Sequence, residues 1–424
     1  MFTRNRIKIS EKLLSLSWQR LLGRELTSLE GKRFKVIYPG RINNDSGPDF
    51  RDALIAIDSS ELVRGDIEIH VKSSDWYSHG HHRDPEYNKV ILHVVGCDDY
   101  GLATLLQSGK SIPLLSLSKE LREQSWLMPH HRLPCFQVMN RMDEQALKKL
   151  LHAAGEERFK QKAILFQTGL SREEAGQALF HGMMRALGYA KNMEPFEDLA
   201  NRVPLSFLEK PELSQSLLLK QAWLLGTAGL LSCQRLKGET RELGRIWQLV
   251  GQGAETMEES NWHFSHVYPN NSPLRRIIAQ TYLLQRYHES GLFHGVLQLV
   301  REAPLLAANH ALEEGLIVPG DGQEKVRKTA LLGRSKADEI VVNVILPFTF
   351  SWGEICHEKE LAEKALEIYL SYPRLSENEI TRHMARQFCL EGSSDLAACH
   401  QQGLIHIYRT HCREGGCGEC PLAG

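Results

Sequence analysis

The chain has 424 residues, of which 42% are hydrophobic and 24% are charged, an ordinary globular composition. Lysine and arginine total 51 while aspartate and glutamate total 52, so a uniformly basic nucleic-acid-binding protein is excluded. The nine cysteines, an odd number spread along a long chain, argue against a secreted disulfide framework. We find no signal peptide and no stretch of about 18 unbroken apolar residues, so we expect a cytoplasmic protein without membrane contact.

The N-terminal quarter of the chain combines one helix with several strands. Apolar residues at helical spacing predict a helix over 8–25. Short segments rich in β-branched residues and bounded by turn-forming residues predict five strands, at 32–40, 52–58, 65–76, 89–99 and 111–118. We therefore expect residues 1–125 to form a small α/β domain with a mixed sheet.

After residue 125 the hydrophobic pattern becomes helical. Apolar spacing predicts helices at 171–189, 214–231, 271–288, 336–348, 357–370 and 381–388. Their expected starts are capping boxes at Ser171 with Glu174 and at Ser376 with Glu379, and Ser272 followed by Pro273. The predicted fold class is therefore α+β, in which residues 126–424 form a larger all-α domain.

One predicted strand carries the clearest chemical pattern. Polar and apolar residues alternate over 65–72, so Asp66, Glu68, His70 and Lys72 share one face. A half-buried strand whose polar face meets water would show the same alternation, and this alternative stays open.

A carboxylate precedes the neighbouring strand. Asp49 and Glu68 supply oxygen ligands of the kind that Mg²⁺ or Mn²⁺ prefers. His70 and Lys72 supply groups that can orient water or stabilise developing charge. The combination suits metal-assisted phosphodiester cleavage, and Glu25, at the expected end of the first helix, is a further candidate carboxylate.

A histidine-rich turn follows the polar strand and permits a second chemistry. Imidazole and carboxylate are ligands of Zn²⁺, and they occur together at His79, His81, His82, Asp84 and His93. A zinc-dependent hydrolase is therefore a second hypothesis, although the H-E-x-x-H helix of zinc peptidases is missing. Solvated turn histidines, with His93 as a core histidine, are the competing interpretation.

The order of these elements resembles the core of the PD-(D/E)XK nuclease superfamily. Pro48-Asp49 is similar to its first motif, and the strand from Glu68 to Lys72 is similar to its second. The superfamily usually places the acid and the lysine two residues apart, whereas here they are four apart. Either His70 replaces the lysine after Glu68, or His70 replaces the acid before Lys72.

The turn DWYSHGHH resembles the histidine-rich turn of very-short-patch repair endonucleases, a divergent branch of that superfamily. Histidines take over from the lysine in that branch. The resemblance therefore implies a restriction-endonuclease-like N-terminal domain in which His79, His81 or His82 acts as general acid or base.

The chain as a whole resembles the bacterial domain-of-unknown-function family 2851. The resemblance rests on GPDF, GDIEIHVKSSDWYSHGHH, YNKVILHVV, YPNNSPLRR, QQGLIHIY and the closing cysteines. This family implies no established activity. We therefore keep three hypotheses about function. The first is a metal-dependent phosphodiesterase or nuclease acting on DNA, the second is a non-catalytic nucleic-acid-binding or scaffold protein built on a decayed nuclease fold, and the third is the zinc-dependent hydrolase that uses the histidine turn.

Three cysteines close together at the C-terminus predict a second metal site. Cys412, Cys417 and Cys420 follow the pattern C-x4-C-x2-C, which can wrap Zn²⁺ or an iron–sulfur cluster. The candidate fourth ligands are Cys389, Cys399, His406 and His411. A reduced tail without metal is the alternative.

Overall fold

The computed structural model describes residues 10–43, 46–58, 61–118, 135, 142–231, 240–264, 271–320, 330–390, 396–414, 416 and 419–422. The chain divides into two units. The first comprises residues 1–154, 377–394 and 402–424, and the second comprises 155–376 and 395–401. The predicted domain boundary near residue 125 falls within 119–134, outside the described residues, and stays a prediction.

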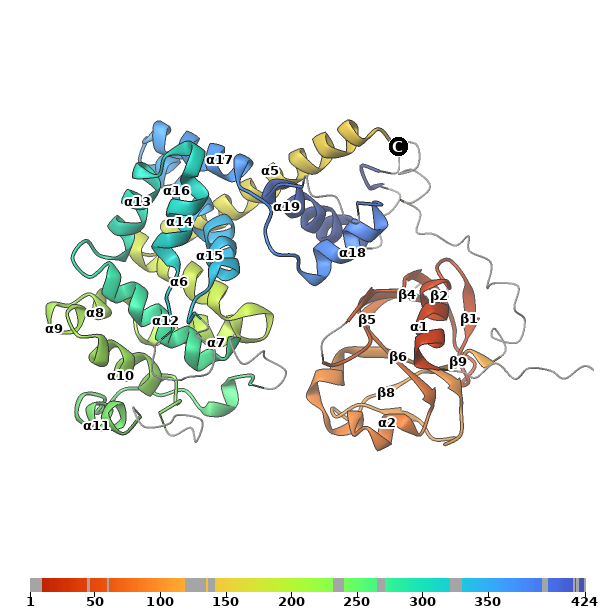
Figure 1. Ribbon diagram of the computed structural model, residues 1–424. Coiled ribbons are helices and arrows are strands. Elements are labelled where there is room, and N and C mark those ends of the chain that lie inside the picture. The colour runs from red at the N-terminus through yellow and green to blue at the C-terminus, as the bar shows by residue number, and fades with distance from the viewer. Residues whose placement is uncertain are drawn as a thin grey trace, which may run out of the picture. The chain divides into compact units, whose positions relative to one another are not determined.

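The first unit is built on a sheet, as the strand patterns predicted (Figure 1). Its strands are β1 (Glu25–Thr27), β2 (Arg33–Tyr38), β3 (Arg41–Ile42), β4 (Phe50–Ile57), β5 (Glu61–Lys72), β6 (Val90–Cys97), β7 (Thr104–Leu105), β8 (Ser111–Ile112) and β9 (Leu114–Ser116). The main sheet has the order β1-β2-β4-β5-β6-β9, β3 pairs with β4, and β7 and β8 form a separate pair.

Both strand orientations occur in this sheet. β1, β2, β4 and β5 pair antiparallel, whereas β5 with β6 and β6 with β9 pair parallel. A parallel pair needs a crossover connection, because the chain must return to the starting edge before it can form the second strand. Residues 73–89 make that crossover between β5 and β6. The mixed sheet and the α+β class predicted from the sequence are thus confirmed.

Helix α1 (Glu11–Gln19) covers the apolar face of β5. Leu14 and Trp18 pack in one cluster with Ile67 and Ile69, and the Ser10 side chain caps the helix by accepting from the Leu13 N–H. The helix is shorter than the predicted 8–25. Glu25 consequently lies on the short strand β1, with its side chain exposed, and not at the end of this helix.

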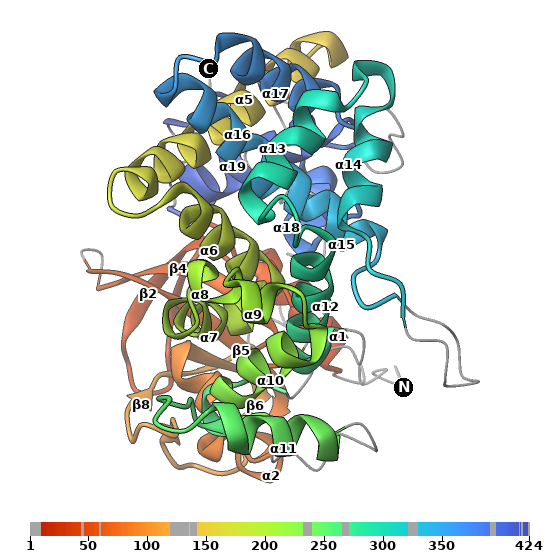
Figure 2. The ribbon, with the colours of Figure 1, turned by 90° about the vertical axis from the view of Figure 1, so that its left-hand side faces the viewer.

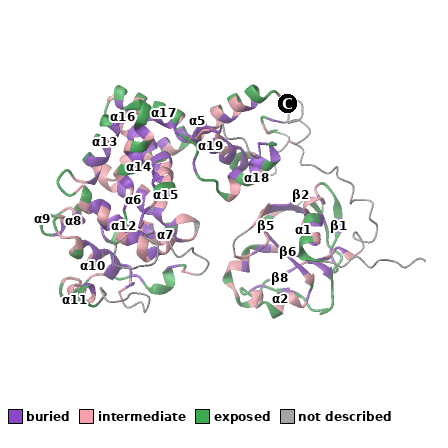
Figure 3. Ribbon diagram, viewed as in Figure 1, coloured by how far each residue is buried: buried purple, intermediate pink, exposed green. Residues whose placement is uncertain are grey.

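The crossover covers the opposite face of β5. It contains α2 (Asp75–Ser78) and two short 3₁₀ helices, His81–Arg83 and Pro85–Lys89. Trp76 and Tyr87 from the crossover pack with Val90, Leu106 and Ile112. Figure 3 accordingly shows buried residues along the central strands.

Helices make up the described secondary structure of the second unit, apart from an isolated bridge between Val318 and Leu332. The helices from residue 144 to residue 371 are α5 (Glu144–Leu170), α6 (Ala175–Leu187), α7 (Tyr189–Arg202), α8 (Leu205–Leu208), α9 (Pro211–Ser214), α10 (Leu217–Thr227), α11 (Thr240–Val250), α12 (Pro273–Arg286), α13 (Leu292–Glu302), α14 (Ala308–Leu316), α15 (Arg334–Ile340), α16 (Leu346–Ile355) and α17 (Lys359–Ser371). A π-helical segment, Val341–Ile345, joins α15 to α16. Figures 1 and 2 show α6 beside α7 and α10 beside α11, pairs that are in contact.

Of the predicted helix starts, that at Ser272 is confirmed, because its side chain accepts from the Arg275 N–H and Pro273 is the first helical residue. The box at Ser171 is wrong. α5 continues to Leu170, and the Ser171 hydroxyl donates to the Thr168 carbonyl at the end of that helix.

The box at Ser376 is wrong by two residues. Asn378 and Thr381 form the capping box of α18 (Glu379–Gln387). Asparagine caps a helix as well as serine does, so the sequence offered two equivalent starts. The last helix is α19 (Ala398–Ile407), followed by the π-helical segment Tyr408–Cys412. No helix among the described residues combines the length and apolar character needed to cross a membrane.

The C-terminal segments of the first unit bind its sheet through polar side chains. The Tyr38 hydroxyl on β2 lies 2.8 Å from His383 Nε2 on α18. Arg41 on β3 pairs with Glu379. The Tyr408 hydroxyl donates to Asp52 Oδ2 on β4, at 3.2 Å.

Gly65 on β5 lies where the backbone of β5 comes close to the start of β6, and a substitution there tests this contact. A Cβ atom there would lie 2.5 Å from the Lys89 carbonyl oxygen and would also clash with the Ile91 side chain. We expect Gly65→Ala to lower the free energy of unfolding by about 1–3 kcal/mol, as overpacking does. Gly244→Ala on α11, where no atom lies within 4 Å, is the control and should raise stability by about 0.5–1 kcal/mol. Urea unfolding measures both, and equal effects would contradict the described contact.

His383 makes the stability of the first unit depend on pH. Burial, followed by Arg41 and Arg386, lowers the pKa of this imidazole to about 4. As the pH falls below about 6.5, the unfolded chain takes up a proton that the folded chain takes up only near pH 4, so stability is lost across that window. His383 should account for up to about 2 kcal/mol of the loss between about pH 7 and pH 5.

We expect His383→Gln to weaken this pH dependence in urea unfolding. His310→Gln, which replaces an exposed imidazole beside Glu314, should leave it as in the parent chain. An unchanged slope in the His383 variant would show that His383 is not the titrating group.

Candidate metal centre

Three of the four side chains on the polar face of β5 are buried, which excludes the interpretation that this face simply meets water. Asp66, Glu68 and His70 are exposed by 5%, 5% and 2%. Polar groups at such depth need partners, because an unsatisfied buried donor or acceptor costs about 1–3 kcal/mol. The partners come from β4, β6 and the crossover.

Glu68 lies at the junction of β4 and β5. Its Oε2 accepts a hydrogen bond from the Asp49 N–H at 3.0 Å, and Asp49 Oδ2 accepts one from the Ile69 N–H at 2.9 Å. These two bonds fix both carboxyl groups to the neighbouring strand. Residues 49 and 68 therefore lie beside each other where β4 begins next to β5.

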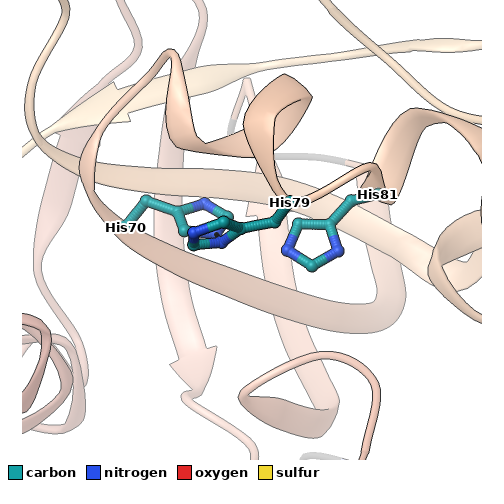
Figure 4. A group of neighbouring side chains, drawn as sticks. All are labelled: His70, His79 and His81. Carbon is teal, nitrogen blue, oxygen red and sulfur yellow. Dashed lines mark hydrogen bonds between the residues drawn. The ribbon is translucent and has the colours of Figure 1, made fainter.

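Three imidazoles gather on the other side of Glu68. His70 comes from β5, His79 follows α2, and His81 begins the first 3₁₀ helix of the crossover. Their ligand nitrogens lie within 4.8 Å of one another. Figure 4 shows the three rings side by side beneath the crossover turn. His70 is buried, His81 is partly buried and His79 is exposed, so solvent reaches the cluster from the side of His79.

The spacing of these atoms matches the edges of a metal coordination polyhedron. Two ligands at the Zn–N distance of about 2.0–2.1 Å on a tetrahedral ion lie about 3.4 Å apart. Glu68 Oε1 lies 3.4 Å from His70 Nε2 and 3.3 Å from His81 Nε2. His79 Nδ1 lies 3.2 Å from His70 Nε2. Each of these three distances fits two ligands of one ion, and the three imidazoles form the group whose ligand atoms all lie close together.

Aromatic rings and a further histidine pack around the cluster. The His81 ring stacks on Tyr87, with centroids 3.9 Å apart, and lies edge-on to Trp76. His70 Nδ1 lies 2.9 Å from His93 Nε2. The Trp76 indole N–H donates to the Leu105 carbonyl at 3.0 Å, which ties the crossover to β7.

Burial disfavours charge on the two carboxyl groups and on the buried and partly buried imidazoles of this region. It raises the pKa of Asp49 to about 6 and, together with the nearby Asp49, that of Glu68 to about 9. Burial and neighbouring imidazoles lower the pKa of His70 to about 2, that of His81 to about 4 and that of His93 to about 3. These histidines are therefore neutral near pH 7, the form in which imidazole binds a metal ion.

Lys72 and Asp66 do not join the imidazoles. The Lys72 side chain is 57% exposed, and its Nζ lies 3.6 Å from Asp99 Oδ2. Asp66 accepts from Arg51 Nη1 at 2.8 Å and from the Asp52 N–H at 3.1 Å. The strand alternation predicted one shared face correctly, but only Glu68 and His70 from that face meet the crossover histidines.

The C-terminal cysteines lie partly outside the described residues, because Cys417 belongs to the part that the structure does not describe. Cys412 Sγ lies 3.9 Å from Met384 Sδ. Cys412 and Cys420 belong to the first unit. Cys399, one of the expected fourth ligands, is buried within the second unit beside Gly155.

Comparison with known proteins supplies a family. A family model described as a protein of unknown function, DUF2851, matches residues 11–378, most of the chain. The chain belongs to the DUF2851 family. The family resemblance seen in the sequence is thus confirmed. The strands β4 and β5 lie inside the matched region of this DUF2851 protein, and so do Glu68, His70, His79 and His81. Neither the curated proteins nor the solved structures contain a significant match.

Proposed function

We propose that this chain is a metal-dependent phosphodiester hydrolase acting on DNA. Its metal ion would be held by His70, His79 and His81 together with Glu68. The observation that carries the proposal is the convergence of three imidazoles whose ligand nitrogens lie within 4.8 Å of one another, with Glu68 Oε1 3.3–3.4 Å from two of them. Hydrogen bonding between the side chains explains each distance singly, but a shared ion explains why three imidazoles and a carboxyl converge.

The donor set favours a transition metal over Mg²⁺. Imidazole ligands suit zinc, iron and related ions, whereas Mg²⁺ takes oxygen ligands in an octahedral arrangement. We therefore expect Zn²⁺ or Mn²⁺ at this site, and such an ion would act as a Lewis acid toward a phosphoryl group. Asp49 would hold Glu68 in place from β4, since its N–H binds the Glu68 carboxyl group.

The order of elements supports a phosphodiester substrate. α1 is followed by the antiparallel strands β2, β4 and β5, and a crossover then leads to β6, parallel to β5. This order resembles the nuclease core described above, with Asp49 at the start of the second of these strands and Glu68 on the third. In that comparison His70 occupies the place of the lysine two residues after the acid. Lys72 is exposed and has no role in the proposed site.

Glu68→Gln tests the proposal, because it keeps the side-chain shape but cannot lose a proton to become the negatively charged ligand that a metal ion would bind. With Mn²⁺ or Zn²⁺ we expect the parent chain to nick supercoiled plasmid DNA, and the variant to be slower by at least about 100-fold. Glu61→Gln, an exposed residue at the other end of β5, is the matched control and should cleave normally.

Metal content gives a readout independent of cleavage. The double variant His79→Asn/His81→Asn should lose one equivalent of metal, whereas His310→Asn should lose none. Folded parent protein that binds no Zn²⁺ or Mn²⁺, or that binds but never cleaves DNA, would overturn the enzymatic proposal and favour a non-catalytic binding or scaffold protein.

We also propose, from the sequence pattern, a separate Zn²⁺ or iron–sulfur site at Cys412, Cys417 and Cys420. Elemental analysis distinguishes it from the histidine cluster, because Cys412→Ser/Cys420→Ser should remove only the metal that the double histidine variant retains. An iron–sulfur cluster would also colour the protein.

A further inference from the structure

A buried row of polar side chains lies directly behind the histidine cluster. His93 on β6 is fully buried and is the register partner of Glu68 on β5. Its Nε2 lies 2.9 Å from His70 Nδ1, and its Nδ1 lies 3.1 Å from Thr104 Oγ1 on β7. Thr104 is 2% exposed. The row Thr104–His93–His70 therefore runs through the interior of the first unit and ends at the cluster.

We propose that His93 and Thr104 are positioning residues that fix the tautomer and the ring orientation of His70 for metal binding. The inference rests on the proposed metal site and adds to it two residues that do not touch the ion. Histidine ligands of metals commonly donate their second ring N–H to a protein acceptor, which sets the tautomer and strengthens the ligand. Here the acceptor would be an imidazole instead of a carboxylate.

The order of protons along the row follows from one requirement. If His70 Nε2 presents a lone pair to the ion, its proton must lie on Nδ1, which then donates to His93 Nε2. His93 must in turn carry its own proton on Nδ1 and donate it to Thr104 Oγ1. A protonated His93 would bring two N–H groups face to face, so the row works only with both imidazoles neutral.

Packing holds the row in place. The Trp76 ring lies against His93, with centroids 5.1 Å apart, and its indole N–H is bound to Leu105, the residue after Thr104. Thr104 pairs with Ile112 across the β7–β8 ladder. The β7–β8 pair therefore sets the position of Thr104, and through it the ring of His93. Neither ring can turn without breaking a buried hydrogen bond.

Three substitutions at His93 separate its two hydrogen bonds. His93→Gln places an amide oxygen near the position of Nε2 and can still accept from His70. His93→Asn reaches only the position of Nδ1, so it can contact Thr104 but not His70. His93→Leu removes both bonds and keeps an apolar side chain of similar bulk.

The experiment is a titration of the metal-free full chain with Zn²⁺ and with Co²⁺, by calorimetry and by the visible spectrum of the cobalt form. We expect His93→Gln to bind within about threefold of the parent chain, and His93→Asn and His93→Leu to bind about 10–100-fold more weakly with altered cobalt bands. Thr104→Val, which removes only the distant hydroxyl, should weaken binding by less than about tenfold.

Ile112→Val is the matched control for a purely structural effect. It disturbs the apolar cluster of Ile112, Trp76 and Tyr87 beside the row without removing a hydrogen bond, so it should lower the melting temperature and leave the metal affinity unchanged. The positioning role would be overturned if His93→Leu bound metal as tightly as the parent chain does. It would also be overturned if every variant, Ile112→Val included, lost metal affinity in proportion to its fall in melting temperature. A parent chain that binds no metal would instead overturn the proposed function itself, and the positioning role with it.

Discussion

Burial of the Glu68 carboxyl group is the constraint on which the rest of the first unit depends. A carboxyl group removed from water must keep its proton or gain compensating partners, because an isolated buried charge is very costly. Glu68 receives the Asp49 N–H on one oxygen and faces two imidazoles with the other. The partners of the buried carboxyl group thus come from the start of β4, from β5 itself and from the crossover.

The parallel pairing of β5 with β6 creates that environment. A hairpin would have left the polar face of β5 open, but a parallel neighbour requires a crossover, and this crossover lies over the polar face. His79 and His81 are carried on it and reach back to His70, only about ten residues earlier in the chain. A cluster made from so short a segment needs little long-range folding, whereas His93 and Thr104 enter it only when β6 and β7 have assembled.

Sequence periodicity predicted a large part of this arrangement. The alternation over residues 65–72 placed Glu68 and His70 on one face, and the β-branched segments located the central strands. Neither pattern could tell whether that face would be buried, because burial depends on how the crossover packs and not on the strand itself. For the same reason the exposed position of Lys72 could not be distinguished in advance from the buried position of His70.

Other features lacked any local signal. Tyr87 and Thr104 lie outside every predicted strand and belong to no chemical pattern, and His93 could be either a ligand or a core histidine until its neighbours were known. The helix starts show the same limit, because Ser376 and Asn378 are comparable caps and tertiary packing chose between them. The continuity of α5 up to Leu170 likewise removed Ser171 from the helix start that its sequence suggested.

The first unit is assembled from three separate stretches of chain, of which the second contains α18 and the third contains the π-helical segment at Tyr408. A ribosome makes the second and third stretches only after it has made residues 155–376, most of the second unit. Until then Tyr38 on β2 lacks its contact with His383, and Asp52 on β4 lacks its hydrogen bond from Tyr408, so the nascent sheet misses two of its polar contacts while residues 155–376 are made. Domains generally fold as units during translation. The N-terminal stretch of a newly made chain should accordingly depend on chaperones until the other two stretches of the first unit have been made.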